Sequence, residues 1–212
     1  MTAALFDMDG TLVDSEPRSM AVWALLLEEN GLPYDETLIR SFMGRRGKDV
    51  FPEVLHMFPG RTTDDLIAET RALVSRPALP PIGQVAGAVP LVTTLAQLGV
   101  PIGVVTSGWR GYADDMLSSI GVRHLLDTVV TAEDVADGKP HPAGYLLGCE
   151  RLGADPASTV AFEDSPAGIA AAKAAGLYCV GLTTTHAAAE LAAADSVVED
   201  LSRVAWPIDV PA

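Results

Sequence analysis

The sequence predicts an α/β fold in which helices cover both faces of a parallel sheet and a helical segment interrupts that sheet after its first strand. Three observations support this prediction. A short apolar run, Ala3–Phe6, leads directly into a polar turn. From about residue 82, continuous apolar runs alternate with helical segments, which is typical of parallel strands buried on both faces. Between these two parts, residues 16–81 have helical periodicity.

The inserted segment is expected to consist of several short helices. Four apolar residues follow the i, i+3, i+4, i+7 spacing of one helix face: Met20, Trp23, Ala24 and Leu27. Asn30 and Gly31 end this helix, and further helices are expected at about residues 36–43, 48–57 and 63–75. A cluster of helix breakers then marks the exit from the segment: Pro77, Pro80, Pro81 and Gly83.

The remainder of the chain is expected to alternate between helices and strands. Strands are predicted at residues 102–105, 128–130, 159–162, 178–181 and, as a short last strand, 196–198. Helices are predicted near residues 86–98, 110–119, 142–152 and 166–175. The Ala-rich stretches 170–175 and 187–194 are also expected to be helical, because alanine has the highest helix propensity.

The charge balance narrows the possible partners. The chain has 28 acidic residues against 14 Lys and Arg residues, which gives a net charge of −14. This field repels polyanions, so no nucleic-acid partner is expected. An anionic substrate would need a local group of cations or a metal ion to reverse the field.

The sequence also indicates the compartment. It has no charged leader followed by an apolar stretch, and no run approaches the roughly 20 apolar residues that span a bilayer. Cys149 and Cys179 could form one disulfide, but two reduced thiols fit better with the absence of secretion signals. A cytoplasmic protein without membrane contact is expected. No apolar helix face demands a partner, so a monomer is expected.

Two carboxylates, Asp7 and Asp9, directly follow the first strand. Spaced one residue apart before a glycine, they can turn both side chains toward one point. An EF-hand calcium loop also begins D-x-D, but it requires Asp or Asn, Gly and Glu at its fifth, sixth and twelfth positions. This chain has Thr11, Leu12 and Arg18 there. For either aspartate taken alone, capping of a turn is the alternative.

Two further groups suit a phosphate. Thr106 and Ser107 end the strand at 102–105, where a hydroxyl and backbone N–H groups could bind phosphate oxygens; an N-cap for the next helix is the alternative. Lys139 stands between Gly138 and Pro140 on a loop that enters a helix, and its charge could hold a phosphoryl group. A solvated surface lysine is the alternative.

Two adjacent acids, Glu163 and Asp164, follow the strand at 159–162 and suit a magnesium site. Helix capping by Asp164 or Ser165, with Pro166 at the first helical position, is the alternative. Parallel sheets bind ligands outside the carboxyl ends of their strands. We therefore expect a single cation to be surrounded by five side chains: Asp7, Asp9, Thr106, Lys139 and Asp164.

The joint pattern resembles the four motifs of the haloacid dehalogenase-like superfamily. Residues 6–15 resemble the first motif, and residues 105–107, 139–140 and 163–168 resemble the other three in order. The segment 139–176 is most similar to sugar and polyol phosphatases related to beta-phosphoglucomutase. The resemblance covers the whole chain. It implies a Rossmann-like catalytic core of residues 1–15 and 82–212 and a small all-helical cap of residues 16–81.

The resemblance also implies the activity of a phosphoric monoester hydrolase that acts on a small phosphorylated metabolite. The resemblance to sugar and polyol phosphatases implies a sugar or polyol phosphate as the substrate. Asp7 would be the nucleophile that forms an aspartyl-phosphate, and Asp9 the general acid and base. Thr106, Ser107 and Lys139 would stabilise the transferring phosphoryl group.

The same resemblance implies a metal and further binding residues. Mg²⁺ would be held by Asp7, Asp164 and Glu163, with Asp9 contributing through its backbone carbonyl. Gly10 in the turn, and Arg45 and Arg46 in the cap, would add to phosphate binding.

Three other functions agree less well with the sequence. Asp9 argues against a dehalogenase, which lacks a second acid in this role. A phosphosugar mutase would usually have a histidine where this chain has Ser19, although Arg45, Arg46 and Lys48 could replace the mutase's cap residues. A solvated basic turn is equally compatible with these three. A catalytically inactive phospho-ligand binding protein would be expected to have lost motif residues. Ala143 also departs from the acid usual in the family, which could loosen the Lys139 loop.

Overall fold

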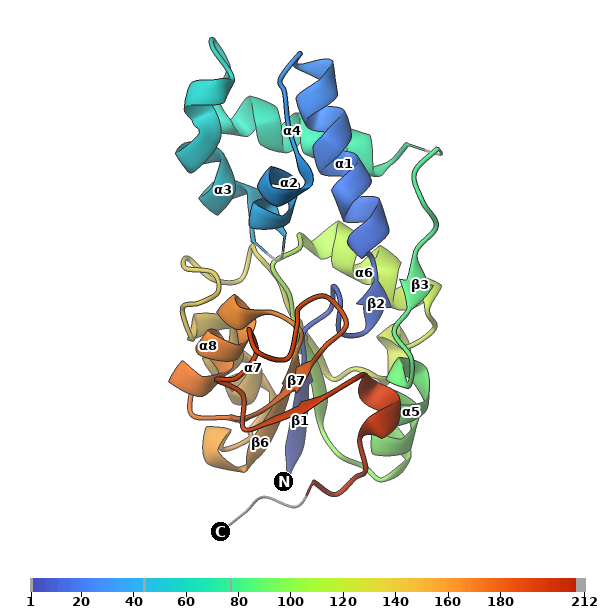
Figure 1. Cartoon of the computed structure of the whole chain (residues 1–212). Coiled ribbons are helices and arrows are strands. Elements are labelled where there is room, and N and C mark those ends of the chain that lie inside the picture. Colours follow the sequence, from blue (N-terminus) through green and yellow to red (C-terminus); the bar gives the residue numbers. More distant parts are fainter. Residues whose placement is uncertain (1, 44, 77, 209–212) are drawn as a thin grey trace. The chain divides into compact units, whose positions relative to one another are not determined.

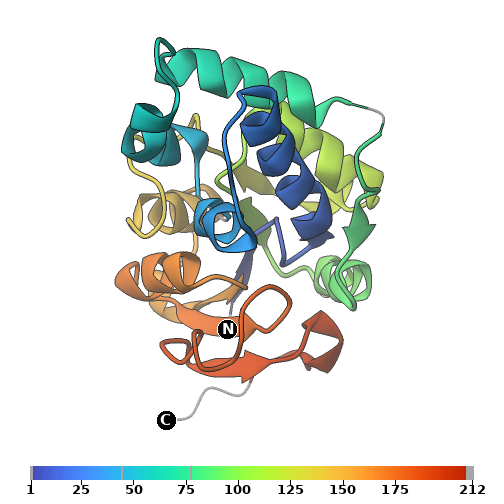
Figure 2. The ribbon, with the colours of Figure 1, turned by 45° about the horizontal axis from the view of Figure 1, so that its top comes forward.

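A computed structural model describes residues 2–43, 45–76 and 78–208 and is drawn in Figures 1 and 2. The chain divides into two compact units. The core unit comprises the residues up to Asp14 and from Gly83 on, and the inserted unit comprises Ser15–Ile82. Each unit has a hydrophobic cluster of its own. That these parts act as a catalytic core and a cap stays a prediction.

The core unit is built on a six-stranded parallel sheet with the strand order β5-β4-β1-β6-β7-β8. Its strands are β1 (Ala3–Phe6), β4 (Ile102–Val105), β5 (Thr128–Val130), β6 (Thr159–Glu163), β7 (Tyr178–Leu182) and β8 (Ser196–Val198). From β1 the chain builds outward to β4 and β5, and then returns to β6 on the other side of β1. Ligands of parallel sheets bind at such a switch point.

Helices cover both faces of this sheet. Helices α7 (Ala143–Leu152) and α8 (Pro166–Ala174) share a buried cluster with Leu5, Val105 and Ala161 of the strands. Helices α5 (Ala88–Gln97) and α6 (Arg110–Ser119) lie on the opposite face (Figure 1). Strands covered on both sides have no solvent-facing side chains, which explains their continuous apolar runs. The predicted α/β fold class is confirmed.

The inserted unit consists of helices around a separate core. The helices are α1 (Glu16–Glu29), α2 (Glu36–Phe42), α3 (Gly47–Val54) and α4 (Thr63–Val74), with a 3₁₀ turn at Leu55–Met57. Trp23 packs against Phe42 and Phe51, with ring centroids 4.8 and 5.5 Å away. A reciprocal pair of hydrogen bonds between Thr62 and Asp65 fixes the start of α4.

A two-residue antiparallel pair lies where the chain leaves and re-enters the core unit. Strand β2 (Val13–Asp14) pairs with β3 (Gly83–Gln84), so that Val13 faces Gln84 and Asp14 faces Gly83. The sequence analysis did not predict this pair, because two residues are too few to show a strand periodicity.

The predicted helix at residues 187–194 is wrong, since this stretch forms turns. Leu191 is fully buried in the cluster beneath α8, and the backbone N–H of Ala187 donates to Glu190 Oε2 at 3.0 Å. Just after the stretch, Asp195 accepts a 2.8 Å hydrogen bond from the Cys179 N–H. An isolated helix of this length is marginal, so these tertiary contacts override the propensity of alanine.

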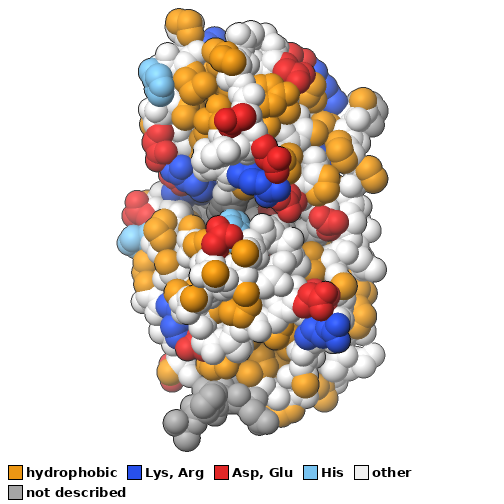
Figure 3. Space-filling model, viewed as in Figure 1, with side chains coloured by type: hydrophobic (Ala, Val, Ile, Leu, Met, Phe, Trp, Pro, Cys, Tyr) orange, Lys and Arg blue, Asp and Glu red, His pale blue; other side chains and the backbone are white. Residues whose placement is uncertain are grey.

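The surface agrees with the acidic composition. On the face drawn in Figure 3, several Lys and Arg side chains lie beside Asp or Glu side chains, so this face offers a polyanion no broad basic surface. Within the described part of the chain, none of the helices has both the length and the apolar character that crossing a bilayer requires.

Candidate active site

The predicted residues of the core unit lie at or beyond the carboxyl ends of its strands. Asp7 follows β1, Thr106 follows β4, Glu163 is the last residue of β6, and Asp164 comes next. Lys139 lies on the loop from β5 to α7. In parallel strands these ends meet at one edge of the sheet, which brings together residues far apart in the sequence.

Lys139 joins two of the buried carboxylates. Its ammonium group pairs with Asp7 Oδ1 and also with Glu163 Oε1, the latter at 2.6 Å. The hydroxyl of Tyr145 donates to the same Glu163 oxygen at 2.7 Å, and the Lys139 nitrogen lies 5.5 Å from the centre of the Tyr145 ring. These contacts fix the direction of the Lys139 side chain, whereas a solvated surface lysine would have no such contacts.

The start of α8 is shaped around Glu163. Ser165 caps the helix by accepting a 3.1 Å hydrogen bond from the Gly168 N–H, and its hydroxyl is 3.2 Å from Glu163 Oε2. A Cβ at Gly168 would overlap the Glu163 carboxylate. Only glycine therefore leaves room for this fully buried side chain. Predicted helix capping and a site role for Glu163 are thus compatible.

Asp164 is held by residues from two other strand ends. Thr185, just after β7, donates to Asp164 Oδ2, and Thr184 donates to the Gly10 carbonyl at 2.5 Å. Thr11 lies 3.5 Å from Asp164 Oδ1. Gly10 has a φ of +82°, and a Cβ there would overlap the Asp164 carboxylate. The glycine is required both by its backbone conformation and by this close approach.

Three of these carboxylates could hold a metal ion. Asp7, Glu163 and Asp164 each offer one oxygen such that the three lie within 4.8 Å of one another. Asp7 Oδ2 is buried, and no described atom hydrogen-bonds to it. When all three carboxylates are ionised, they exceed the single ammonium of Lys139 by two negative charges, and hard divalent cations take such oxygen ligands. The residues fit a divalent cation.

The pKa values of the cluster also indicate a site for a cation. Burial raises the pKa of Asp7 well above its usual range; Lys139 lowers it, and Glu163 and Asp164 raise it again. Burial, followed by the charge of Glu163, raises the pKa of Asp164 to about 7. Burial lowers the pKa of Lys139, but the charges of Asp7 and Glu163 outweigh it and hold that pKa above its usual value. The cluster therefore lacks positive charge, although its lysine is charged.

Asp9 and Thr106 are held by the turn between β4 and α6. The hydroxyl of Tyr112 donates to Asp9 Oδ1 at 2.7 Å. The Gly108 N–H donates to Thr106 Oγ1 at 2.9 Å, which leaves the hydrogen of that buried hydroxyl to be donated to a ligand. Ser107 lies between them and is half-buried.

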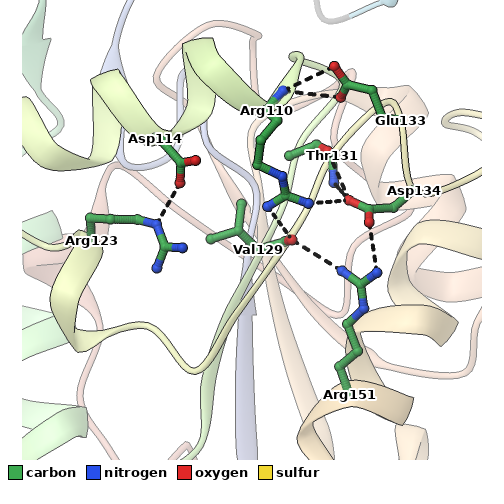
Figure 4. Close-up of polar contacts among 8 residues, drawn as sticks. All are labelled: Arg110, Asp114, Arg123, Val129, Thr131, Glu133, Asp134 and Arg151. Atoms are coloured by element: carbon green, nitrogen blue, oxygen red, sulfur yellow. Dashed lines mark hydrogen bonds and ion pairs between the residues drawn. The ribbon is translucent and has the colours of Figure 1, made fainter.

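Two arginines hold the loop that begins after β5. Arg110 from α6 and Arg151 from α7 converge on the Val129 carbonyl and on the Asp134 carboxylate (Figure 4). Their bonds to Asp134 are 2.6 and 2.7 Å long, and Thr131 donates two more at 2.8 Å. Burial raises the pKa of Asp134, but the hydrogen bonds from Arg151 and Thr131 prevail and lower it to about 2. The start of the Lys139 loop is thus fixed.

The two cap residues predicted to bind phosphate pair with acids of the inserted unit. Arg45 donates to Glu53 Oε1 at 2.5 Å, and Arg46 donates to Asp49 Oδ2 at 2.5 Å. Arg46 is buried, with 6% of its surface exposed. Phosphate binding by Arg45 and Arg46, and any role of Lys48, stay predictions.

Among the described residues, several that contact the site were not predicted, including Thr11, Tyr112, Tyr145 and Thr185. Thr185 follows a predicted strand, so the rule that ligands bind at strand ends could have identified it. Tyr112 and Tyr145 each lie on a helix beside a predicted motif, and nothing in their spacing indicates which carboxylate they contact.

Comparison with known proteins agrees with this geometry. Residues 4–182 match the model of the haloacid dehalogenase-like hydrolase family. The chain is 48% identical to validoxylamine A 7'-phosphate phosphatase of Streptomyces hygroscopicus subsp. limoneus, over 96% of each chain. It is 34% identical to hexitol phosphatase A of Escherichia coli (strain K12), over 94% of this chain and 91% of the relative.

The solved structures include a putative beta-phosphoglucomutase from Thermotoga maritima, with a TM-score of 0.73 and 28% identity over 95% of this chain and 96% of the other. The phosphatases among the relatives confirm the prediction of a phosphoric monoester hydrolase over the mutase and the inactive binding protein. The chain belongs to the haloacid dehalogenase-like hydrolase family.

Proposed function

We propose that this hydrolase is magnesium-dependent and removes phosphate from a small sugar or polyol phosphate, with Asp7 as its nucleophile. One observation supports this most strongly. Asp7 is paired through Oδ1 with Lys139, while its buried Oδ2 has no hydrogen-bond partner among the described atoms and lies within the cluster of three carboxylates. An oxygen in this position is available to a metal ion or to phosphorus.

The transferring phosphoryl group would be bound by groups that donate hydrogen bonds or carry positive charge. Lys139 is charged and fixed in direction by its contacts with Glu163 and Tyr145. The Thr106 hydroxyl already accepts a hydrogen bond and can donate its own hydrogen. The Ser107 N–H and the Gly10 turn would supply further donors. Donors arranged beforehand stabilise the charge that spreads over the phosphoryl oxygens.

The reaction would proceed in two displacements. In the first, a carboxylate oxygen of Asp7 bonds to phosphorus while the bond from phosphorus to the substrate oxygen breaks, and Asp9 gives its proton to the departing alkoxide. In the second, water attacks the phosphorus, Asp9 takes the water proton, and the bond to Asp7 breaks. Both carboxylates return to their initial states.

A magnesium ion would be held by the carboxylates of Asp7 and Asp164, with Glu163 beside them and the Asp9 carbonyl as a further ligand. When bound, it supplies positive charge to the phosphate oxygens. The excess of acidic groups in the cluster supports this assignment. It also explains how a chain of net charge −14 binds an anion.

The substrate class rests on the relatives. One is named for validoxylamine A 7'-phosphate and another for hexitol phosphates. Both names describe phosphates on polyhydroxylated carbon frameworks, so a sugar or polyol phosphate is the proposed class. A cytoplasmic location and a monomeric state stay predictions.

The test is phosphate release by the purified protein, with magnesium and then with excess EDTA. The panel contains glucose 6-phosphate, glucitol 6-phosphate, glycerol 1-phosphate, p-nitrophenyl phosphate, nucleotides and small-acid phosphates. We expect fastest release from a sugar or polyol phosphate and loss of release with EDTA.

The nucleophile is tested by Asp7→Asn. An amide attacks phosphorus poorly, so the rate should fall by about 10³-fold or more. The matched control, Asp115→Asn at an exposed position of α6, should keep the wild-type rate. Mass spectrometry after an acid quench should find one added phosphoryl group on the peptide that contains Asp7. Near-normal turnover by Asp7→Asn would overturn the assignment.

A further inference from the structure

Asp9 receives a hydrogen bond from a residue outside all four motifs. The hydroxyl of Tyr112, in the first turn of α6, donates to Asp9 Oδ1 at 2.7 Å. The two residues are 103 positions apart in the sequence, and both belong to the core unit.

The Asp9 backbone is fixed by a tight turn. The Gly10 N–H donates to the Val13 carbonyl at 2.8 Å, and the N–H groups of Leu12 and Val13 both donate to the Met8 carbonyl at 2.9 Å. The main chain therefore sets where the Asp9 side chain starts. It does not set the rotation of the carboxyl group about its last bond, which depends on the side-chain contacts of Asp9.

Tyr112 is itself held firmly. Its ring packs on Trp109, with centroids 5.1 Å apart and planes inclined at 38°. On another side it fills the space above Gly108, where a Cβ would come within 2.9 Å of the ring. The Gly108 carbonyl accepts a 3.0 Å hydrogen bond from the Ala132 N–H, which connects this turn to the loop after β5. Because its ring is held in place, the Tyr112 hydroxyl can orient the Asp9 carboxyl group.

A phenol bonded to one carboxyl oxygen has a chemical consequence. Whether Asp9 is charged or neutral, Oδ1 can accept the Tyr112 hydrogen. In the neutral acid the carbonyl oxygen is the better acceptor, so this bond favours the proton on Oδ2. The bond therefore helps to hold the carboxyl group in one orientation in both of its protonation states.

We propose that Tyr112 is a positioning residue that helps to fix the rotation of the Asp9 carboxyl group for proton transfer to the leaving group. The proposal rests on the proposed function, in which Asp9 protonates the leaving group. It extends that function by naming a residue outside the four motifs that contributes to the orientation of this acid.

The test is Tyr112→Phe, which removes the hydroxyl and keeps the ring that packs on Trp109 and Gly108. Two substrates that differ in their leaving group are compared: p-nitrophenyl phosphate, and the sugar or polyol phosphate of the panel that the wild type hydrolyses fastest. Nitrophenolate departs as a stable anion and needs no proton, whereas an alkoxide does. Since kcat/KM covers steps up to the first irreversible one, it reports transfer to Asp7.

We expect kcat/KM for the sugar or polyol phosphate to fall about 10- to 100-fold, since a misplaced acid loses much of its contribution. For p-nitrophenyl phosphate it should stay within about twofold, given that only proton delivery changes. The matched control is Tyr178→Phe, at the amino end of β7 and so at the far edge of the sheet. It should change neither value.

A double-mutant cycle separates positioning from a merely structural role. In the Asp9→Asn background, Tyr112→Phe should cause no further loss on the sugar or polyol phosphate, because both changes remove the same proton transfer. Equal losses on both substrates, or losses that multiply in the double variant, would overturn the proposal. Should Tyr112→Phe fail to fold, Trp109→Leu loosens the same ring and should again lower only the alkyl phosphate value. If the wild type releases no phosphate from any substrate, the proposed function itself fails, and that outcome is distinct from the others.

Discussion

Replacement of Gly168 by alanine tests how tightly α8 is built around Glu163. The new Cβ would overlap the carboxylate, which cannot stay where Tyr145 and Lys139 hold it. Overpacking of a core typically costs about 1–3 kcal/mol. A displaced hydrogen bond to a charged group costs about 1.5–3 kcal/mol more. Alanine recovers about 1 kcal/mol of helix propensity. The free energy of unfolding should therefore fall by about 1.5–5 kcal/mol.

The assay is urea unfolding followed by far-UV circular dichroism, with Gly111→Ala as the matched control. Gly111 also lies in the first turn of a helix that follows a strand end, but a Cβ there meets its nearest atom at 3.7 Å, an ordinary contact. That variant should be as stable as the wild type or more stable by about 0.4–1 kcal/mol. If Gly168→Ala behaved like Gly111→Ala, the argument that α8 is shaped by the buried carboxylate would be wrong.

Two further predictions concern charge. Asp134→Asn should be less stable than the wild type at neutral pH, because hydrogen bonds from Arg151 and Thr131 lower the pKa of Asp134 to about 2 in the folded state. Because the pKa of Asp134 is lower in the folded than in the unfolded state, its charged form stabilises the fold. This stabilisation is present above about pH 3.9, the usual pKa of an unfolded aspartate, and is lost as the pH falls toward about 2. The gap in Tm between the two proteins should therefore close over that window; a gap unchanged at the acid end would contradict the cause, and Asp115→Asn should show none. Magnesium should raise the Tm of the wild type, by mass action equivalent to about 2.7 kcal/mol at 100 times its Kd. EDTA should reverse this rise in Tm, and Asp164→Asn should make it smaller. If magnesium did not change the Tm of the wild type, the carboxylate cluster would not be a magnesium site.

The sequence predicted correctly those parts of the fold that have a continuous run of one residue type. The central strands are mostly apolar because both faces of the sheet are covered, so their positions could be predicted from the residues alone. The rule for strand ends then predicted that Asp7, Lys139 and Asp164 share one edge. The structure contains this juxtaposition.

The parts that escaped prediction depend on contacts between distant segments. The stretch 187–194 has a helical composition, but burial of Leu191 decides its conformation. Tyr112 contacts Asp9, and Tyr145 contacts Glu163, only because helices on opposite faces of the sheet begin near the same edge. A local pattern carries no information about such a partner.

The short β2–β3 pair has a consequence for how this chain could be rebuilt. Asp14 and Gly83 face each other as neighbours in an antiparallel ladder, so the segment between them begins and ends at one point of the core unit. A two-residue hairpin turn spans such a gap. We therefore expect that the segment Ser15–Ile82 could be deleted, or exchanged for another, without changing the lengths of the connections of the six-stranded sheet.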